Sequence, residues 1–226
     1  LEGVVFENPM LTDENGKPHL ETADKYLSGN IRKKLEFMQK NYSDNSKYAN
    51  NTEALKNAMP KPLQAADIDI KLGATWLSPQ IIQEFMYENL KTPVYCQEKG
   101  YKSYGRSHNI KIEFSPYTAE WSVVNKASDR NNKAANAKFG TARITAYEQL
   151  ENCLNLRSTV IRDKVERNGK DAYVLNQKET DFAQEKQKDL QECFKNWIFA
   201  NPERREKIVE QYNVLFNSTR PREYDG

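Results

Sequence analysis

Apolar residues recur along much of the chain at three- and four-residue spacings, the pattern of a helix with one buried face. Ile31, Leu35, Met38 and Tyr42 follow this spacing after a short polar stretch. The same pattern returns in residues 51–59, 77–90, 141–156 and 176–217. These segments are predicted to be helices, and each needs a partner for its apolar face.

Capping residues mark where several of these helices begin. Ser28 is a candidate N-cap, and Ser78 is another, followed by Pro79 at the first helical position, where a missing N–H costs nothing. Asn176 can cap a long helix, and Pro202 can start the last one. These last two helices each carry an apolar seam, so they are predicted to pair as a C-terminal helical hairpin.

Alternation of polar and apolar residues predicts strands in the middle of the chain. Residues 109–124 are predicted to form one hairpin, and residues 159–176 a second one around Asn168–Gly169, a pair that tolerates a tight turn. Residues 67–73 also alternate and are predicted to form a strand. Residues 125–140 are polar and are predicted to be a loop.

Together these elements predict an α+β fold, in which a small, mostly antiparallel sheet built from hairpins is surrounded by helices. Residues 1–21 mix Pro, Gly, Asn and charge without a period and are predicted to be a linker. Residues 22–217 are predicted to form a single accessory domain. Residues 218–226 come after the last helical pattern and are predicted to be a junction to a further part of a longer polypeptide.

The overall composition narrows the class of protein only modestly. The 226 residues include 34 Lys and Arg against 32 Asp and Glu, so the formal net charge of +2 does not by itself imply a nucleic acid or membrane partner. No apolar run approaches the roughly 20 residues that a membrane span needs, so no membrane partner is expected. Three cysteines are an odd number without metal-ligand spacing, which favours free thiols in the cytoplasm.

The distribution of charge is more informative than its sum. Between Lys99 and Thr145 nine basic residues stand against three acids, a local net charge of +6 (9 − 3). Cations that follow phosphates, with aromatic rings that stack on bases, are typical of single-strand binding. The predicted nucleic-acid-binding residues are Lys99, Tyr101, Lys102, Tyr104, Arg106, Lys111, Arg130, Lys133 and Lys138. In the alternative interpretation, the charges only solvate a sheet and a loop, and the aromatic residues fill its core.

Catalytic motifs are scarce in this sequence. It contains neither a GxxxxGK[ST] phosphate loop nor a GxGxxG turn, and its two histidines have no ligand-spaced partners. Asp67, Asp69 and Lys71 would share one face of the predicted strand, with Glu113 on a neighbouring strand. Two carboxylates and a lysine so placed could hold a divalent ion and orient water in a metal-dependent nuclease. The alternative is the solvated face of an amphipathic strand.

Several stretches taken in order resemble a known kind of protein. They are YLSGNIRKKL, LGATWLSP, FSPYTAEW, FGTARITAYEQLENCLNLR, VLNQKETDFAQEKQ and FNSTRPREYDG. They are similar to the region that precedes the helicase core in large bacteriophage and conjugative-element proteins. Those proteins join an adenine-specific DNA methyltransferase to a Swi/Snf-type superfamily-two helicase. The resemblance covers residues 22–226 and places residues 218–226 where the helicase core, absent from this chain, would begin.

The resemblance implies a DNA-processing polypeptide of the bacterial cytoplasm, whose ATP, magnesium and S-adenosylmethionine would serve parts outside this chain. No catalytic residue of either enzyme can be transferred onto it. The expected function is therefore a non-catalytic accessory segment that contacts DNA and couples the flanking helicase and methyltransferase domains. The alternatives are a purely structural spacer that docks the ATPase lobe, and the nuclease of Asp67, Asp69 and Lys71.

Overall fold

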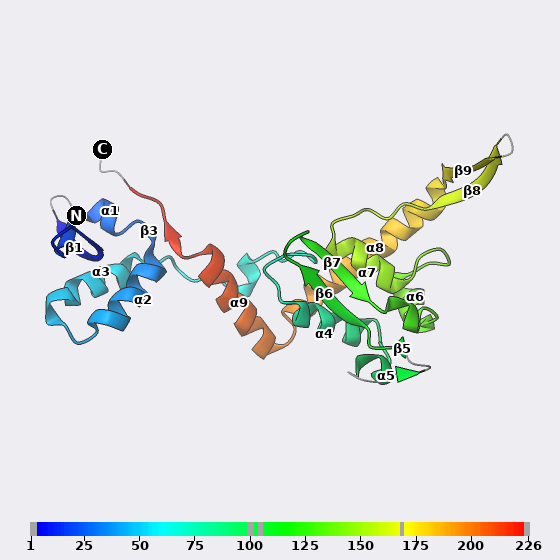
Figure 1. The fold of residues 1–226 in the computed structure, drawn as a ribbon, viewed down its shortest axis with the longest axis horizontal. Helices are drawn as coiled ribbons and strands as arrows, with labels where there is room; N and C mark the ends of the chain where they lie inside the picture. The colour runs from blue at the N-terminus through cyan, green and yellow to red at the C-terminus, as the bar shows by residue number, and fades with distance from the viewer. Residues whose placement is uncertain (1–3, 99–101, 104–105, 168–169, 224–226) are drawn as a thin grey trace. The chain divides into compact units, whose positions relative to one another are not determined.

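The computed structural model describes residues 4–98, 102–103, 106–167 and 170–223 (Figure 1). Contacts within the chain group it into two compact units. Unit 1 comprises Leu1–Ile68 and Pro202–Gly226, and unit 2 comprises Asp69–Asn201. The sequence predicted one domain over residues 22–217, and whether the two units act as one domain stays a prediction.

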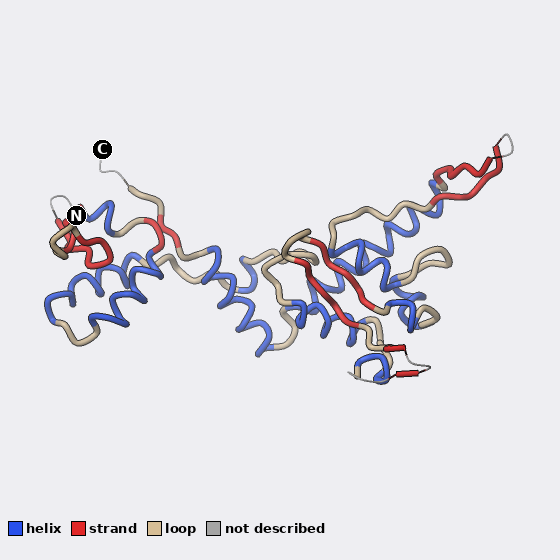
Figure 2. Tube along the Cα trace, viewed as in Figure 1, coloured by secondary structure: helices blue, strands red, loops and turns tan. Residues whose placement is uncertain are grey.

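The α+β fold class is confirmed. Among the described residues the strands form five separate two-stranded antiparallel sheets set among helices (Figure 2). The strands are therefore hairpins and short pairs, and they do not join into the one small sheet that was expected. The two C-terminal helices both form, but they belong to different units, so their pairing as a hairpin also stays a prediction.

Unit 1 contains short strands, helices and two 3-10 turns. Its elements are β1 (Val5–Thr12), β2 (Pro18–Thr22), α1 (Ala23–Tyr26), β3 (Gly29–Asn30), α2 (Ile31–Tyr42), η1 (Ser46–Tyr48), α3 (Ala49–Ala58), η2 (Ala65–Asp67), α9 (Pro202–Phe216) and β10 (Thr219–Arg220). The predicted helices at 29–42, 51–59 and after Pro202 are thereby confirmed.

The linker predicted over residues 1–21 is wrong for its described part, because β1 and β2 form an antiparallel hairpin there. Phe6 reaches the core of unit 1 and stacks on Tyr26 with ring centroids 4.9 Å apart. Asn8 is buried on the same strand, and its Nδ2 donates to Oε2 of the buried Glu21 at 2.9 Å. Because Asn8 and Glu21 form this hydrogen bond with each other, both polar side chains can be buried. A segment whose sequence is polar can therefore still pack against the core.

The helices of unit 1 pack through the apolar faces that the sequence marks. Ile31 and Met38 of α2 are buried together with Leu55 of α3. The cap of α2 is Asn30, whose side chain accepts the Lys33 N–H at 2.9 Å, and not the expected Ser28.

Unit 1 also includes the last helix and the residues after it. Asn213 of α9 holds the backbone of Leu63 from both sides, because its Oδ1 accepts the Leu63 N–H at 2.8 Å and its Nδ2 donates to the Leu63 carbonyl at 3.0 Å. The predicted junction at 218–226 starts with β10, which pairs with β3. Its role as a connection to a further domain stays a prediction.

Unit 2 carries the two long hairpins and the longest helix. Its elements are α4 (Pro79–Asn89), α5 (Val94–Gln97), β4 (Lys102–Ser103), β5 (Arg106–Ser107), β6 (Lys111–Ser115), β7 (Glu120–Val124), η3 (Lys126–Asp129), α6 (Lys133–Phe139), α7 (Ala146–Leu154), β8 (Arg162–Arg167), β9 (Lys170–Leu175) and α8 (Gln177–Ile198). Both predicted hairpins are confirmed as strand pairs, and the turn at Asn168–Gly169 lies outside the described residues.

Three helices form the core of unit 2, and the caps of two of them are the predicted ones. The Ser78 side chain caps α4 and the Asn176 side chain caps α8. Phe85 of α4 meets Phe194 and Trp197 of α8 edge-on, with centroids 5.1 and 5.3 Å apart. The face of α7 that carries Leu150 and Cys153 is fully buried.

Two further predictions of local structure are wrong. The strand predicted over residues 67–73 does not form, although Ile68, Ile70 and Leu72 are buried as an alternating strand would bury them. Gly73 ends this stretch at φ +100°, and a Cβ there would lie 2.4 Å from the Leu154 carbonyl oxygen, so only glycine fits. The predicted loop at 125–140 instead contains η3 and α6.

The expected free thiols are confirmed for Cys96, Cys153 and Cys193, of which only Cys193 is partly exposed. Within the described ranges, every helix is too short or too polar to traverse a bilayer.

Candidate functional site

The cationic part of unit 2 is organised by the segment between β7 and α7. Asn132 caps α6, since its Oδ1 accepts the Ala135 N–H at 3.0 Å, and its Nδ2 donates to the Leu90 carbonyl at 3.0 Å. Ala135 and Phe139, one helical turn apart, anchor α6 in the core. With only these two buried positions, the helix gives a weak apolar period, which explains why the sequence suggested a loop.

One of the three acids in the basic stretch is turned inward. The Asp129 carboxylate accepts from Asn132 Nδ2 and from the Tyr147 hydroxyl, both at 2.7 Å. The buried Tyr147 hydroxyl also lies 2.9 Å from Thr92 Oγ1, and burial is the main cause that raises the pKa of Tyr147. Because Asp129 serves this internal network, it does not pair with the exposed cations beside it.

A polar pocket of about 520 Å³ opens between α6 and the start of α7. It is lined by Arg130, Asn131, Asn136, Thr141, Ala142, Arg143, Ile144, Thr145 and Glu148. Asn136 fixes its wall, because its Nδ2 donates to the Arg130 carbonyl and its Oδ1 accepts the Ala146 N–H, each at 2.9 Å. Gly140 lets the loop approach closely, since a Cβ there would lie 3.0 Å from Asn136 Cα.

Two guanidinium groups set the charge of this pocket. Arg143 is held in place, with its Nη1 donating to Asp163 Oδ1 at 2.7 Å and its Nη2 donating to the Arg162 carbonyl at 2.8 Å. Arg130 is exposed and has no carboxylate within ion-pair distance in the described part of the chain. A guanidinium has five N–H donors, so Arg143 keeps donors for a further acceptor.

The one carboxylate that lines the pocket is already occupied. Glu148 Oε2 accepts from the Thr145 N–H at 2.8 Å and from Thr145 Oγ1 at 2.9 Å, in the capping box of α7. Arg143 is neutralised by Asp163 beside the pocket, whereas Arg130 has no carboxylate partner in the described residues, so Arg130 supplies the unpaired positive charge of the pocket. Such a site suits a group with several negatively charged oxygens, such as a phosphate.

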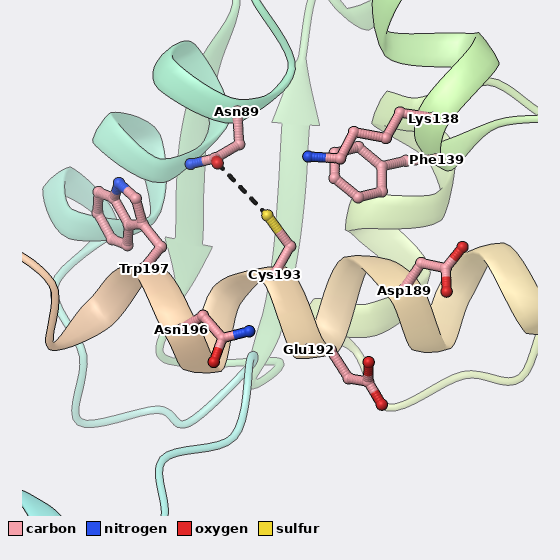
Figure 3. Close-up of a pocket in the computed structure, with 8 residues that line it drawn as sticks. All are labelled: Asn89, Lys138, Phe139, Asp189, Glu192, Cys193, Asn196 and Trp197. Carbon is pink, nitrogen blue, oxygen red and sulfur yellow. Dashed lines mark hydrogen bonds between the residues drawn. The ribbon is translucent and has the colours of Figure 1, made fainter.

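A second pocket, of about 530 Å³, lies between α4, α6 and α8 (Figure 3). Lys138 reaches into it above Phe139, and the Cys193 thiol donates to Asn89 Oδ1 at 3.4 Å. Burial raises the pKa of Cys193, and the Lys138 charge opposes this effect. Asp189 and Glu192 also line this pocket, so it does not share the positive character of the Arg130–Arg143 pocket.

The predicted nucleic-acid-binding residues lie in different parts of the structure. Lys99, Tyr101 and Tyr104 lie outside the described residues. Lys102 and Arg106 take part in the β4–β5 pair, of which only the backbone is described. Lys111 pairs with Glu113, Lys133 is exposed but lines neither pocket, and Lys138 lines the second pocket. These residues do not form one continuous belt in the described structure, and of the predicted set only Arg130 lines the two-arginine pocket.

Sequence reasoning did not assign a binding role to Arg143, Asn136 or Thr141, which line the pocket with Arg130. Arg143 was counted in the basic stretch, but its anchoring depends on Asp163, a residue 20 positions away on β8. The available signal was the polar residues Thr141, Arg143 and Thr145 in the loop after α6, which do not distinguish a pocket wall from a solvated turn.

The arrangement expected for a nuclease is not formed by the described residues. Asp67 Oδ2 accepts the Gln64 N–H at 2.9 Å in a 3-10 turn, and Asp69 pairs with Lys195 at 3.0 Å. Glu113 pairs with Lys111 on its own strand. The shared strand face on which the nuclease interpretation depended is absent there, and nuclease activity stays an untested prediction.

Comparison with protein families places most of unit 2 and the last helix in one family. A family model described as a domain of unknown function (DUF8437) matches residues 71–218. The chain belongs to the DUF8437 family. No curated protein and no solved structure matches the chain. The DUF8437 match includes both pockets and both long hairpins, and its description assigns no activity to them.

Proposed function

We propose that this DUF8437 chain is a non-catalytic accessory segment that contacts DNA. On this proposal the Arg130–Arg143 pocket is the binding site for a backbone phosphate. The observation that carries the proposal is that two arginines line one polar pocket whose only glutamate is committed to a helix cap. Phosphate contacts supply most of the sequence-independent affinity of proteins for nucleic acids. On this proposal the pocket fixes the position of the strand and reads no sequence.

The two arginines would contribute differently. Arg143 is pre-positioned by Asp163 and the Arg162 carbonyl, so little side-chain freedom is lost when its remaining N–H groups donate to a phosphate. Arg130 is exposed without a carboxylate partner in the described ranges, and it is free to close over the anion. Asn131 and Thr141 offer polar side chains beside them.

The wider context of the proposal comes from the sequence resemblance. On the basis of this resemblance, the segment would couple a Swi/Snf-like helicase to a DNA methyltransferase within one polypeptide of a phage or conjugative element. ATP, magnesium and S-adenosylmethionine would act in those flanking domains, in the bacterial cytoplasm, and the segment itself would catalyse nothing. The proposed helicase context can be tested on the gene sequence alone, by searching the codons that follow Gly226 for a GKT-type nucleotide-binding loop.

The pocket is tested by fluorescence anisotropy with short single- and double-stranded DNA over a salt series. We expect binding that weakens with salt. Arg130→Gln and Arg143→Gln should each lower the slope of log K against log salt, and together they should lower it by about 0.7 to 0.9, the contribution of one phosphate. Arg157→Gln is the matched control, since it removes an arginine that pairs with Glu120 away from the pocket. Lys111→Gln should also leave the slope unchanged.

Two results would overturn this proposal. Binding that is indifferent to salt, or absent at low salt, removes the phosphate contact altogether. Equal losses in Arg130→Gln and Arg157→Gln would mean that general charge, and not the pocket, attracts DNA.

One observation favours a second function, the docking spacer. The end of α9 exposes Val214, Leu215 and Phe216, with 41%, 52% and 56% of their surfaces accessible. An apolar helix end of this kind suits a protein partner, and the resemblance would place the ATPase lobe next to it. Pull-down of a separately expressed ATPase part by the wild type, but not by Leu215→Asp, would support this function. Equal capture by both would exclude this surface.

A further inference from the structure

The β8–β9 ribbon is the most exposed hairpin among the described elements. Six residue pairs join its strands, from Arg162↔Leu175 to Arg167↔Lys170. Figure 1 shows it extending away from the rest of unit 2, near the beginning of α8. Val165, Tyr173 and Val174 are 38%, 68% and 51% exposed on it. A hairpin without a packed face is marginally stable alone, so this ribbon would gain from further strands.

One edge of the ribbon has free hydrogen-bonding groups. The Asn176 N–H donates to the Ile161 carbonyl at 2.9 Å, in the same register as the ladder. Hydrogen-bonded and non-hydrogen-bonded pairs alternate along an antiparallel ladder. Because Ile161 and Asn176 form a hydrogen-bonded pair, Lys164 and Glu166 fall at non-hydrogen-bonded positions, and their backbone N–H and C=O groups point away from β9. In the described part of the chain no side chain or strand bonds to these outward groups. Such an edge is a template for another strand.

We propose that the strand which covers this edge is β8 of a second copy of the same chain, antiparallel about a two-fold axis through Val165. In this register Lys164 of each copy lies opposite Glu166 of the other, and both residues point their backbone groups at the partner strand. A shift by two residues in one direction would place Glu166 opposite Glu166. A shift in the other direction would place Lys164 opposite Lys164 and Arg162 opposite Glu166, but the Arg162 carbonyl already accepts from Arg143 Nη2 at 2.8 Å. The like-charge pairs and the occupied Arg162 carbonyl therefore disfavour both shifts, and the opposite-charge pairs of Lys164 and Glu166 stabilise the register centred on Val165.

Two further features favour this pairing. The outward residues of β9 are Asp171, Tyr173 and Leu175, and they offer no opposite charges for a self-pairing of that edge. Within the ribbon, Glu166 lies directly opposite Asp171, and the two carboxylates repel each other. Lys164 Nζ lies 2.8 Å from Asp171 Oδ2, so it offsets this repulsion only at Asp171. Lys164 of the second copy would lie beside Glu166 and offset the repulsion from the other side. The product is a four-stranded sheet in the order β9, β8, β8 and β9.

The paired edges are short, so the interface lies at the small end of specific interfaces and the dimer should be weak and concentration-dependent. Sedimentation velocity of the whole chain from about 5 µM to about 500 µM spans the expected range. We expect a monomer at the low end that shifts toward a dimer as the concentration rises. A wild type that stays monomeric throughout would overturn the proposal.

The decisive variant is Glu166→Lys. In its own ribbon the new lysine faces Asp171, which removes a repulsion, so the hairpin should not unfold. Across the two-fold axis it faces Lys164, so the dimer should weaken about tenfold or more. Glu185→Lys, on the exposed surface of α8, makes the same charge change elsewhere and should leave the dimer intact.

The double variant Lys164→Glu with Glu166→Lys exchanges the two charges and restores both pairs. It should regain the wild-type dissociation constant. If Glu166→Lys dimerises as well as the wild type, the interface lies elsewhere. If the double variant stays monomeric, the register centred on Val165 is wrong. Neither result depends on DNA binding, which uses a different site.

Discussion

The two long hairpins of unit 2 share the same kind of strand pairing but have different surroundings. Both pair without a bulge, and both carry apolar residues on their strands. In β6–β7 the apolar positions are covered, because Ile112, Trp121 and Val123 are 5%, 3% and 3% exposed. In β8–β9 the corresponding apolar side chains, such as Tyr173, face solvent. The apolar residues of a strand thus do not by themselves show what covers them.

The edges differ as much as the faces. The Trp121 N–H donates to Asn155 Oδ1 at 2.9 Å, and the Val123 N–H donates to Glu151 Oε2 at 2.8 Å. On the other edge the Ile112 N–H donates to a side-chain oxygen of α4 at 3.1 Å. Side chains of α4 and of the end of α7 therefore close the β6–β7 ladder. The outward backbone groups of Lys164 and Glu166 on β8 have no such cover in the described residues, and this difference suggests an assembly role for β8–β9.

The largest expected effect distinguishes the two faces. Trp121→Ala should lower the free energy of unfolding by about 3–5 kcal/mol, because it leaves a cavity under β7. Tyr173→Ala should change it by less than about 0.5 kcal/mol at concentrations where the chain is monomeric. Urea unfolding followed by circular dichroism measures both. Similar losses for the two variants would break the comparison of the faces.

The next effect concerns the closed edge. Asn155→Ala removes the side chain that bonds both the Trp121 N–H and, through Nδ2 at 2.8 Å, the Trp121 carbonyl. Leaving these groups unpaired should cost about 1–3 kcal/mol in the same urea assay. Lys164→Ala on the open edge of β8 is the control, and a change within about 0.5 kcal/mol is expected there. An equally small loss for Asn155→Ala would mean that the edge bond is dispensable.

A smaller effect should appear at alkaline pH, through the helix that supports β6–β7. Burial raises the pKa of the Cys153 thiol from 9.0 to about 12. Above pH 9 the unfolded chain loses this proton and the folded chain keeps it, so stability is complete below pH 9 and falls progressively up to about pH 12.

The variant Cys153→Ala isolates this effect. At pH 10 the wild type should have lost about 1.4 kcal/mol of stability through this group relative to pH 7. In Cys153→Ala the difference between the two pH values should shrink by that amount. An unchanged difference would show that the thiol is not shielded as its burial indicates.

Local signals in the sequence predicted much of unit 2. The Ser78 and Asn176 caps and the β6–β7 alternation are decided by residues close in sequence, and they are confirmed. The β1–β2 hairpin was missed because its inward positions include Asn8 and Glu21, which pack only by bonding each other. Residues 68–72 bury alternate side chains without forming a strand. An alternating apolar pattern predicts which side chains are buried, but it does not show that a neighbouring strand is present to pair with the backbone.

The candidate site was less accessible from sequence for the same reason. A local excess of basic residues was visible, but it did not show which of them are neutralised. Lys126 pairs with Glu151 at 2.5 Å and Arg143 with Asp163 at 2.7 Å, and both partners come from distant parts of the chain. Only the fold places Arg130 and Arg143 in one pocket and Lys138 in another.

Amide hydrogen exchange tests the contrast between a closed and an open ribbon most directly. At a protein concentration of about 10 µM, below the expected dimer range, the amides of Ile112, Trp121 and Val123 should be protected, and those of Lys164 and Glu166 should exchange freely. Raising the concentration should slow exchange at Lys164 and Glu166 only. Protection of Lys164 and Glu166 at every concentration, or no protection at any, would contradict the account of an open edge that a second copy covers.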